Sequence, residues 1–340
     1  MASFQETRLQ RAYVQLESLW GTVPNSGGAA TVANGNAFGF ASLSMGQDQP
    51  ELNNPVKTGN LGMIDGTLGR KGPLAFSVDA PLIGSGSAGT APNMGPFYQA
   101  ALGKAPVTVP ATSVTYGADD TNYSVAVFDF VQPSTLEQRC ASGLVINSME
   151  IGAGGDWATV RFSGLGKSLI ESDFFSSLDS VGKSGLSAFP SEPASPTFAY
   201  SPILGHKGVI TLDGVAYTTV VGESIRINLT SGRALISNGW NSDYPAGVTS
   251  GARSVGISFS IYDQDDANTI ALKNKGRAST AVTCSFQLGT VAGNILTVTA
   301  RLKLGRPTFG EANNLRTLSF NTMGRMSTLT AKDDISLAWT

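Results

Sequence analysis

Apolar and polar residues alternate with a period of two along most of the chain. Such alternation predicts strands with one buried and one solvated face, and Gly, Pro and Asp turns separate the segments at short spacing. This pattern predicts an all-β sandwich or barrel with one or two short helices and long loops. The predicted strands are 75–83, 123–131, 143–151, 157–165, 208–212, 224–230, 255–263, 281–288, 295–304 and 315–320.

Helical signals are few and short. We predict helices from Pro96 to Leu102, from Leu169 to Phe174 and from Ala267 to about Lys273, the last with Asp266 as its N-cap. The segment 173–202 is rich in Ser, Gly and Pro and has no period, which predicts a linker or an extended arm.

One stretch of the chain recurs 137 positions later. Ala141-Ser142, Val145, Ser148 and Gly152 are matched by Ala278-Ser279, Val282, Ser285 and Gly289. Chance similarity between β-hairpins is the alternative, and we favour a tandem duplication. The predicted organisation is a first β module over 1–168, with an N-terminal arm and a long loop at 80–96, a linker over 169–205, and a second β module over 206–340.

Composition excludes several classes of protein. Of 340 residues 14% are charged and the formal net charge is −2, so no basic field is available to hold nucleic acid. No apolar run reaches the length of a membrane span. The N-terminus lacks the pattern of a signal peptide, so we expect synthesis in the cytosol, with Cys140 and Cys284 as buried thiols.

The loop after residue 82 spells a G-x-G-x-x-G motif through Gly84, Gly86 and Gly89. A dinucleotide site needs a helix opening at the last glycine and an acid about 20 residues later. Because of Pro92, any helix can begin only well after the last glycine of the motif. The next acids in the chain, Asp119-Asp120, lie in a polar loop. We therefore expect no cofactor and a structural role for this loop.

No cluster of reactive residues stands out. His206 sits between glycines and is expected in a surface turn, with no nucleophile elbow to accompany it. The run from Asp263 to Asp266 lacks the glycine and glutamate of a calcium loop, and Asp119-Asp120 and Asp333-Asp334 are expected to be solvated turn pairs. This absence favours a non-enzymatic scaffold that binds copies of itself, because several predicted strands lack the lysine that would block pairing at an edge.

Four stretches resemble the major tail tube proteins of long-tailed (siphovirus-type) bacteriophages. They are 11–24, 66–103 with its glycine-rich loop, 140–164 with its glycine-turned hairpin, and the closing strands of 305–339. The 84–103 block is the most specific of them.

The resemblance implies a structural virion protein of the phage tail, assembled in the bacterial host cytoplasm. Modules would join edge to edge in a ring, and rings would stack into a hollow tube that conducts DNA during ejection. Implied partners are the chain itself, a tape-measure protein and tail terminator or tip proteins, with transient passage of double-stranded DNA and no membrane. An acidic or neutral lumen is expected, because unpaired Lys or Arg would grip phosphates.

The duplication predicts a ring of three two-module chains, and a hexamer of whole chains is the alternative. The candidate contacts between rings are the N-terminal arm and the 80–96 loop with Gly84, Gly86, Gly89 and Pro92. Valine at Gly86 and Gly89 is expected to leave a folded monomer that polymerises poorly. The rival function is a secreted or surface carbohydrate-binding adhesin, for which exposed Trp157, Trp240 and Tyr244 would be the binding aromatics.

Overall fold

A computed structural model of the chain describes residues 9–26, 29–30, 32–54, 56, 66–131, 138–153, 155–173, 175, 186–193, 199, 201–217, 220–221, 225–237, 239–240, 242–328 and 330–340. Strands dominate these residues, and the α-helices among them are two short ones. The all-β prediction is confirmed, and every predicted strand is present.

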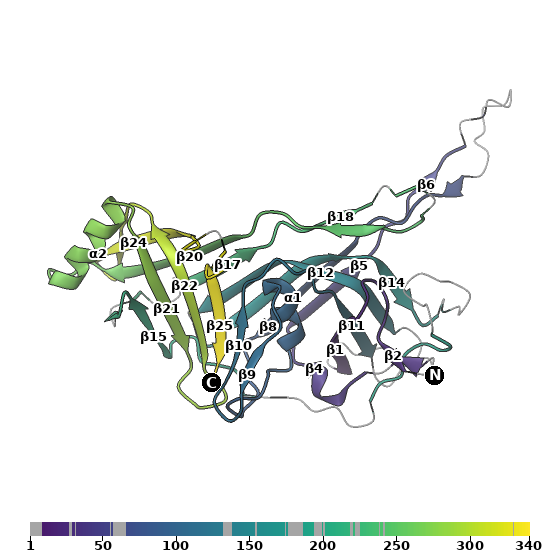
Figure 1. Cartoon of the computed structure of the whole chain (residues 1–340), viewed down its shortest axis with the longest axis horizontal. Coiled ribbons are helices and arrows are strands. Elements are labelled where there is room, and N and C mark those ends of the chain that lie inside the picture. The colour runs from purple at the N-terminus through teal and green to yellow at the C-terminus, as the bar shows by residue number, and fades with distance from the viewer. Residues whose placement is uncertain are drawn as a thin grey trace.

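Eight antiparallel strands form a continuous sheet, here called the long sheet (Figure 1). One face packs on the core and the other is open, as in β20, where Val255, Ile257 and Phe259 are buried between half-exposed neighbours. In spatial order its strands are β5 (Ser42–Gly46), β8 (Leu74–Pro81), β13 (Thr159–Gly166), β12 (Arg139–Ala153), β17 (Ile225–Thr230), β20 (Ser254–Tyr262), β24 (Leu315–Gly324) and β23 (Thr308–Ala312).

Two further sheets are joined to the long sheet: the first shares β12 with it, and the second is joined to it where β22 (Leu296–Leu304) pairs with the end of β24. The first of them forms because β12 is long enough to belong to two sheets. The pairing of β12 with β13 shifts register between Ile146 and Ser148, and the first half of β12 pairs with β11 and β14. This N-terminal sheet contains β4 (Ala37–Phe38), β1 (Gln10–Leu16), β11 (Val125–Val131), β12 and β14 (Ser168–Glu171). The C-terminal sheet contains β9 (Val107–Val109), β10 (Ser113–Gly117), β25 (Ile335–Trp339), β22 (Leu296–Leu304), β21 (Ala281–Leu288), β15 (Gly208–Leu212) and β16 (Val215–Tyr217).

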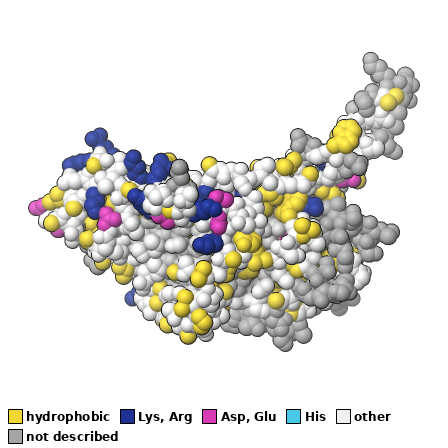
Figure 2. All heavy atoms as spheres, viewed as in Figure 1, with side chains coloured by type: hydrophobic (Ala, Val, Ile, Leu, Met, Phe, Trp, Pro, Cys, Tyr) yellow, Lys and Arg dark blue, Asp and Glu magenta, His cyan; other side chains and the backbone are white. Residues whose placement is uncertain are grey.

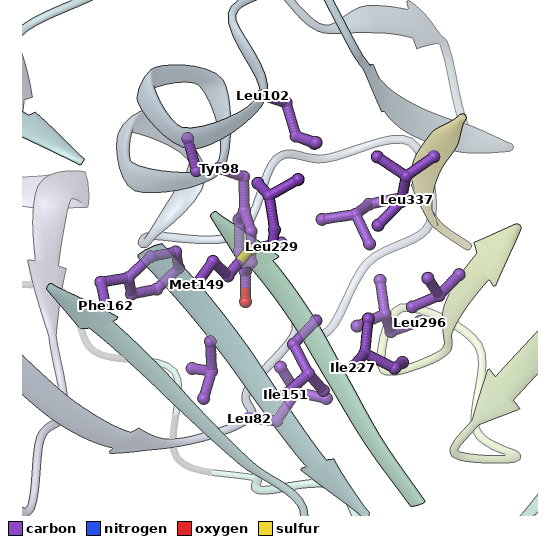
Figure 3. Close-up of a cluster of buried hydrophobic side chains, with 14 of the residues drawn as sticks. Leu82, Tyr98, Leu102, Met149, Ile151, Phe162, Ile227, Leu229, Leu296 and Leu337 are labelled. Carbon is purple, nitrogen blue, oxygen red and sulfur yellow. The ribbon is translucent and has the colours of Figure 1, made fainter. Parts of the chain in front are cut away.

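The main core lies where the long sheet faces helix α1 (Gly95–Leu102) and the C-terminal sheet. Figure 3 shows Met149, Ile151 and Ile227 of the long sheet opposite Tyr98 of α1 and Leu296 of the C-terminal sheet. Both halves of the chain therefore contribute to one core. None of the sheets closes into a barrel within the described residues.

The helix predictions fare differently. Helix α1 is found as predicted, and α2 (Ala267–Arg277) begins at Asp266, whose carboxylate accepts hydrogen bonds from the N–H groups of Asn268 and Thr269. Such a cap contributes about 1 kcal/mol. The helix predicted at 169–174 is wrong: β14 occupies its start, because alternating residues there pair with β12.

Two long hairpins leave the same end of the long sheet and project together at the upper right of Figure 1. The first arm, described over residues 47–54, 56 and 66–73, joins β5 to β8 and contains β6 (Glu51–Leu52) and β7 (Thr67–Leu68). The second arm, described over residues 231–237, 239–240 and 242–253, joins β17 to β20 and contains β18 (Ala234–Ile236) and β19 (Gly247–Thr249). The Lys71 N–H donates to the Asp243 carbonyl at 2.9 Å, so the arms touch. A small ribbon of β2 (Asn25–Ser26) and β3 (Ala29–Ala30) lies near the N-terminus.

Candidate assembly surfaces

The loop predicted to join rings lies between β8 and α1. The Gly86 N–H donates to the Gly293 carbonyl at 3.1 Å, and a Cβ on Gly84 would lie 2.3 Å from that same oxygen. The beginning of the loop is therefore packed on the turn between β21 and β22 of its own chain. A contact with another ring stays a prediction for this loop.

The second half of the loop is packed as well. Gly89 has a φ of +73°, and a Cβ there would lie 2.3 Å from the backbone nitrogen of Ala111. The Pro92 carbonyl accepts the Gly95 N–H at 2.7 Å, immediately before α1 begins. Valine at Gly89 would clash with backbone, so the structure argues against the expectation that this substitution leaves the monomer folded.

The long sheet ends in two strands that each have one neighbour among the described strands. β5 pairs only with β8, and β23 pairs only with β24. Neither strand contains the Lys or Pro that most commonly block pairing at an edge, and Glu311 of β23 is the one charged residue of the two strands. Phe309 of β23 is 55% exposed and lies opposite Leu318 on the core side of the sheet. Both edges thus remain open to another strand.

The open face of the long sheet carries small, polar side chains. Hydroxyl groups bridge neighbouring strands, with Ser148 and Ser163 2.6 Å apart and Ser260 and Ser319 2.7 Å apart. Serines recur in most of its strands, at positions 42, 44, 77, 148, 163, 254, 258, 260 and 319. This face therefore offers hydroxyl groups and little apolar surface.

Charges on this face occur in compensating pairs. Arg161 is 3.4 Å from Asp79, and Arg226 is 3.2 Å from Glu150. These side chains are partly exposed, so each pair contributes at most about 1 kcal/mol to stability. Their main consequence is electrostatic, because the described open face of the eight strands has balanced charge.

A groove of about 900 Å³ opens at the end of the long sheet opposite the arms. Pro81, Pro202 and the turn between β12 and β13 form its walls, together with the four charged residues of the pairs above. Trp157 lines it and is 50% exposed. The lining of the groove therefore combines apolar side chains with two ion pairs.

A buried polar cluster joins the two halves of the chain. Arg233 donates to the carbonyls of Ala100 and Ile146 and, at 2.9 Å, to the Asn122 side chain. Burial, with Arg253 nearby, lowers the pKa of Arg233 to about 10, so the group stays charged at neutral pH.

Of the acid pairs predicted to be solvated, Asp119, Asp120 and Asp334 lie beside this cluster, whereas Asp333 is exposed and accepts the Ser327 N–H at 2.8 Å. Asp334 is buried and accepts two hydrogen bonds from Arg253, at 2.8 and 2.9 Å. Lys332 pairs with both Asp119 and Asp120. The solvated-turn prediction is therefore wrong for Asp334, whose partner lies 81 residues away in the chain and gives no local sequence signal.

A second buried acid fixes the N-terminal strand. The Glu17 carboxylate accepts the N–H groups of Gly21 at 2.8 Å and Gly143 at 2.7 Å, which ties β1 to β12. Burial raises the pKa of Glu17 to about 7, against the lowering effect of these hydrogen bonds and of Lys167. Lys167 also lies over the Trp20 ring, 4.9 Å from its centre.

Other candidates remain isolated. His206 is exposed in a turn, and both cysteines are buried free thiols, as predicted. Within the described residues, no group of three His, Cys, Asp or Glu side chains is placed to hold a metal ion. None of the described helices has the length and apolar character needed to cross a membrane.

An antiparallel sheet with two unblocked edges is typical of structural proteins that associate by strand pairing. The family model described as phage tail tube protein matches residues 7–334, and the chain therefore belongs to the phage tail tube proteins. No curated protein matches it. Membership of this family makes the protein a structural component of a phage tail and implies self-assembly into a tube. The family is not an enzyme family.

Proposed function

We propose that the protein forms rings by pairing β23 of one chain with β5 of the next, and that stacked rings form the hollow conduit for DNA ejection. The observation that carries this proposal is the long sheet with its two open edges. Assembly takes place in the host cytoplasm, and the tape-measure, terminator and tip proteins of the tail are the remaining partners.

Strand polarity supports this pairing. All seven pairings within the long sheet are antiparallel, so its first and last strands run in opposite directions. β23 therefore meets β5 of the next chain as an antiparallel neighbour. Phe309 of β23 then lies on the same side of the joined sheet as Leu43, which is opposite buried Val78. The exposed phenylalanine would be covered by the neighbouring chain.

The order of elements supports a ring of three two-module chains. A strand, an arm, a second strand and a helix follow one another twice, as β5–β8–α1 and as β17–β20–α2. Within the chain, β12 of the first half pairs with β17 of the second. The proposed β23–β5 contact repeats this junction between chains. The division at 169–205 is approximate, because β14 spans 168–171.

We assign the open face of the long sheet to the lumen. Its serines and compensated ion pairs give the neutral lining expected for DNA that must slide without being held. The adhesin alternative gains no support from its aromatics. Trp157 lines the groove, Trp240 is on the second arm at the other end of the strands, and Tyr244 is buried.

Substitution at the edge tests the proposal. Phe309→Lys places a charge where the neighbouring sheet would cover an apolar ring, so we expect soluble, folded chains and at least a tenfold loss of assembled material in sedimentation. Leu19→Lys is the control, because Leu19 is similarly exposed at 68% and lies outside both edges. Normal tubes from Phe309→Lys would contradict the β23 assignment.

A cysteine pair tests the register and the partner strand together. Ser44 and Gly310 are central in β5 and β23 and share the open face. The variant Ser44→Cys/Gly310→Cys should form disulfide-linked oligomers on oxidation, whereas either single variant should not. Crosslinking confined to other strand pairs would refute the proposed ring.

A further inference from the structure

The two α-helices occupy equivalent places in the two halves of the chain but differ in burial. Helix α1 follows β8 and α2 follows β20, and in each half a hairpin, β12–β13 or β23–β24, completes four strands of the long sheet. Seven of the eight residues of α1 are buried. Only three of the eleven residues of α2 are buried, so most of this helix is exposed.

Helix α1 is buried because the second half of the chain covers it. The rings of Tyr98 in α1 and Trp339 in β25 have centres 5.8 Å apart. Arg233, at the base of the second arm, donates to the Ala100 carbonyl of α1. The junction of β12 with β17 therefore has a second layer, in which the helix of one half packs on β25 and the arm base of the other half.

The exposed face of α2 is apolar and carries short side chains. Ala267, Ile270 and Ala271 are three or four positions apart, so they share one face of the helix, and all three are exposed, Ile270 by 43%. Figure 1 shows α2 at the left end of the molecule. Small residues allow another element to approach this face closely.

Ion pairs hold α2 beside the open edge strand β23. Asp263, between β20 and the helix, pairs with Lys273 at 2.7 Å and with Arg316 at 3.2 Å. The Arg316 guanidinium also lies over the Phe309 ring of β23, 3.9 Å from its centre. A chain that pairs with β23 therefore arrives next to α2.

The first half of the chain contains an equivalent of β25. β14 follows β13 as β25 follows β24, and each leaves the long sheet to pair in another sheet. Leu169 of β14 packs on the main core and is only partly buried. Its N–H donates to the side chain of Gln47, at the base of the first arm, at 3.1 Å. Strand β14 and the first-arm base thus form one surface, at the opposite end of the molecule from α2 in Figure 1.

We infer that, in the ring, α2 of one chain packs on β14 and the first-arm base of the next chain, with Ile270 against Leu169. This inference rests on the proposed β23–β5 contact and adds a second layer to it. The occupant is a second copy of this chain, because continuing the long sheet from β23 to β5 places α2 where α1 lies at the junction within the chain.

Charge favours the same partner. Figure 2 shows Lys and Arg side chains gathered toward the left end of the molecule, where α2 lies. The helix contains no acidic residue, and Arg277 at its end is exposed. At the other end of the molecule, β14 ends in Glu171 and is followed by exposed Asp173. Opposite charges on the two surfaces attract an approaching chain and help to orient it.

A charge on the helix face tests the contact. Ile270→Lys should leave the chain folded and reduce rings at least tenfold in sedimentation, because the lysine would meet Leu169 of the next chain. Val209→Lys is the matched control, since Val209 is also 43% exposed and lies on β15, outside the inferred contact. Rings of normal yield from Ile270→Lys would overturn the inference.

A crosslink separates this contact from the sheet contact. Leu169→Cys/Ile270→Cys should form disulfide-linked oligomers on oxidation, whereas Leu169→Cys/Val209→Cys should not, and the native thiols are buried. A chain that crosslinks through Ser44→Cys/Gly310→Cys but not through positions 169 and 270 would overturn the α2 contact alone. Failure of the Ser44→Cys/Gly310→Cys crosslink would instead overturn the proposed ring.

Discussion

At the scale of single residues, Glu17 gives the fold a pH dependence. Its pKa is raised to about 7 in the folded protein by burial, from 4.5 in the unfolded chain. The contribution of the protonated Glu17 to the free energy of unfolding is complete below pH 4.5. It is lost as the pH rises to 7, because the carboxyl group ionises at a lower pH in the unfolded chain than in the folded protein. The difference amounts to at most about 3 kcal/mol.

We therefore predict that the free energy of unfolding falls between pH 5 and pH 7, and that Glu17→Gln removes most of this fall. Urea denaturation of the wild-type protein and of Glu17→Gln at pH 5, 6, 7 and 8 measures the free energy of unfolding. The glutamine side chain keeps the shape of glutamate but does not ionise, so this variant is the control. Parallel pH profiles for the two proteins would show that Glu17 does not titrate in this range.

Substitutions at two glycines of the 80–96 loop distinguish the role of the loop in folding from its role in assembly. Gly86 has a φ of +77° and open space around it, whereas a Cβ at Gly89 would meet backbone. Gly86→Asn should fold, because asparagine tolerates this conformation. Gly89→Val should lose several kcal/mol and accumulate as aggregate.

Thermal melts of both variants check this prediction, and electron microscopy of Gly86→Asn then tests the loop as a ring contact. Shortened tubes from a normally folded Gly86→Asn protein are the expected result. Tubes of normal length would restrict the role of the loop to its packing within the chain.

At the scale of elements, the long strands were predictable from the sequence and the arms were not. β20 and β22 alternate over nine residues each, which is a strong signal for one buried face. The strands of the arms have only two or three residues each, too few to show a period. Ser168–Glu171 has helical propensity, yet its backbone pairs with β12, so tertiary context decides its structure.

The assembly surfaces were also only partly predictable. The absence of lysine on several strands indicated open edges, but the sequence does not show which strands end a sheet. That depends on pairings such as β12 with β17, which join residues about 80 positions apart. The buried Arg253–Asp334 pair is hidden for the same reason.

At the scale of the whole molecule, both halves contribute strands to the long sheet and side chains to the main core. The junction between β12 and β17 continues the sheet across the chain, and Arg233 and Arg253 bind groups from both halves beside it. A chain built this way has an open edge at each end of the long sheet for the next chain. The proposed ring of three chains is based on this construction.

Electron microscopy of reconstituted tubes, at a resolution that traces strands, tests the central claim most directly. The predicted result is three chains per ring, with β23 of each chain antiparallel to β5 of its neighbour and the serine-rich face toward the channel. A ring of six whole chains, or rings joined through other strands, would contradict it.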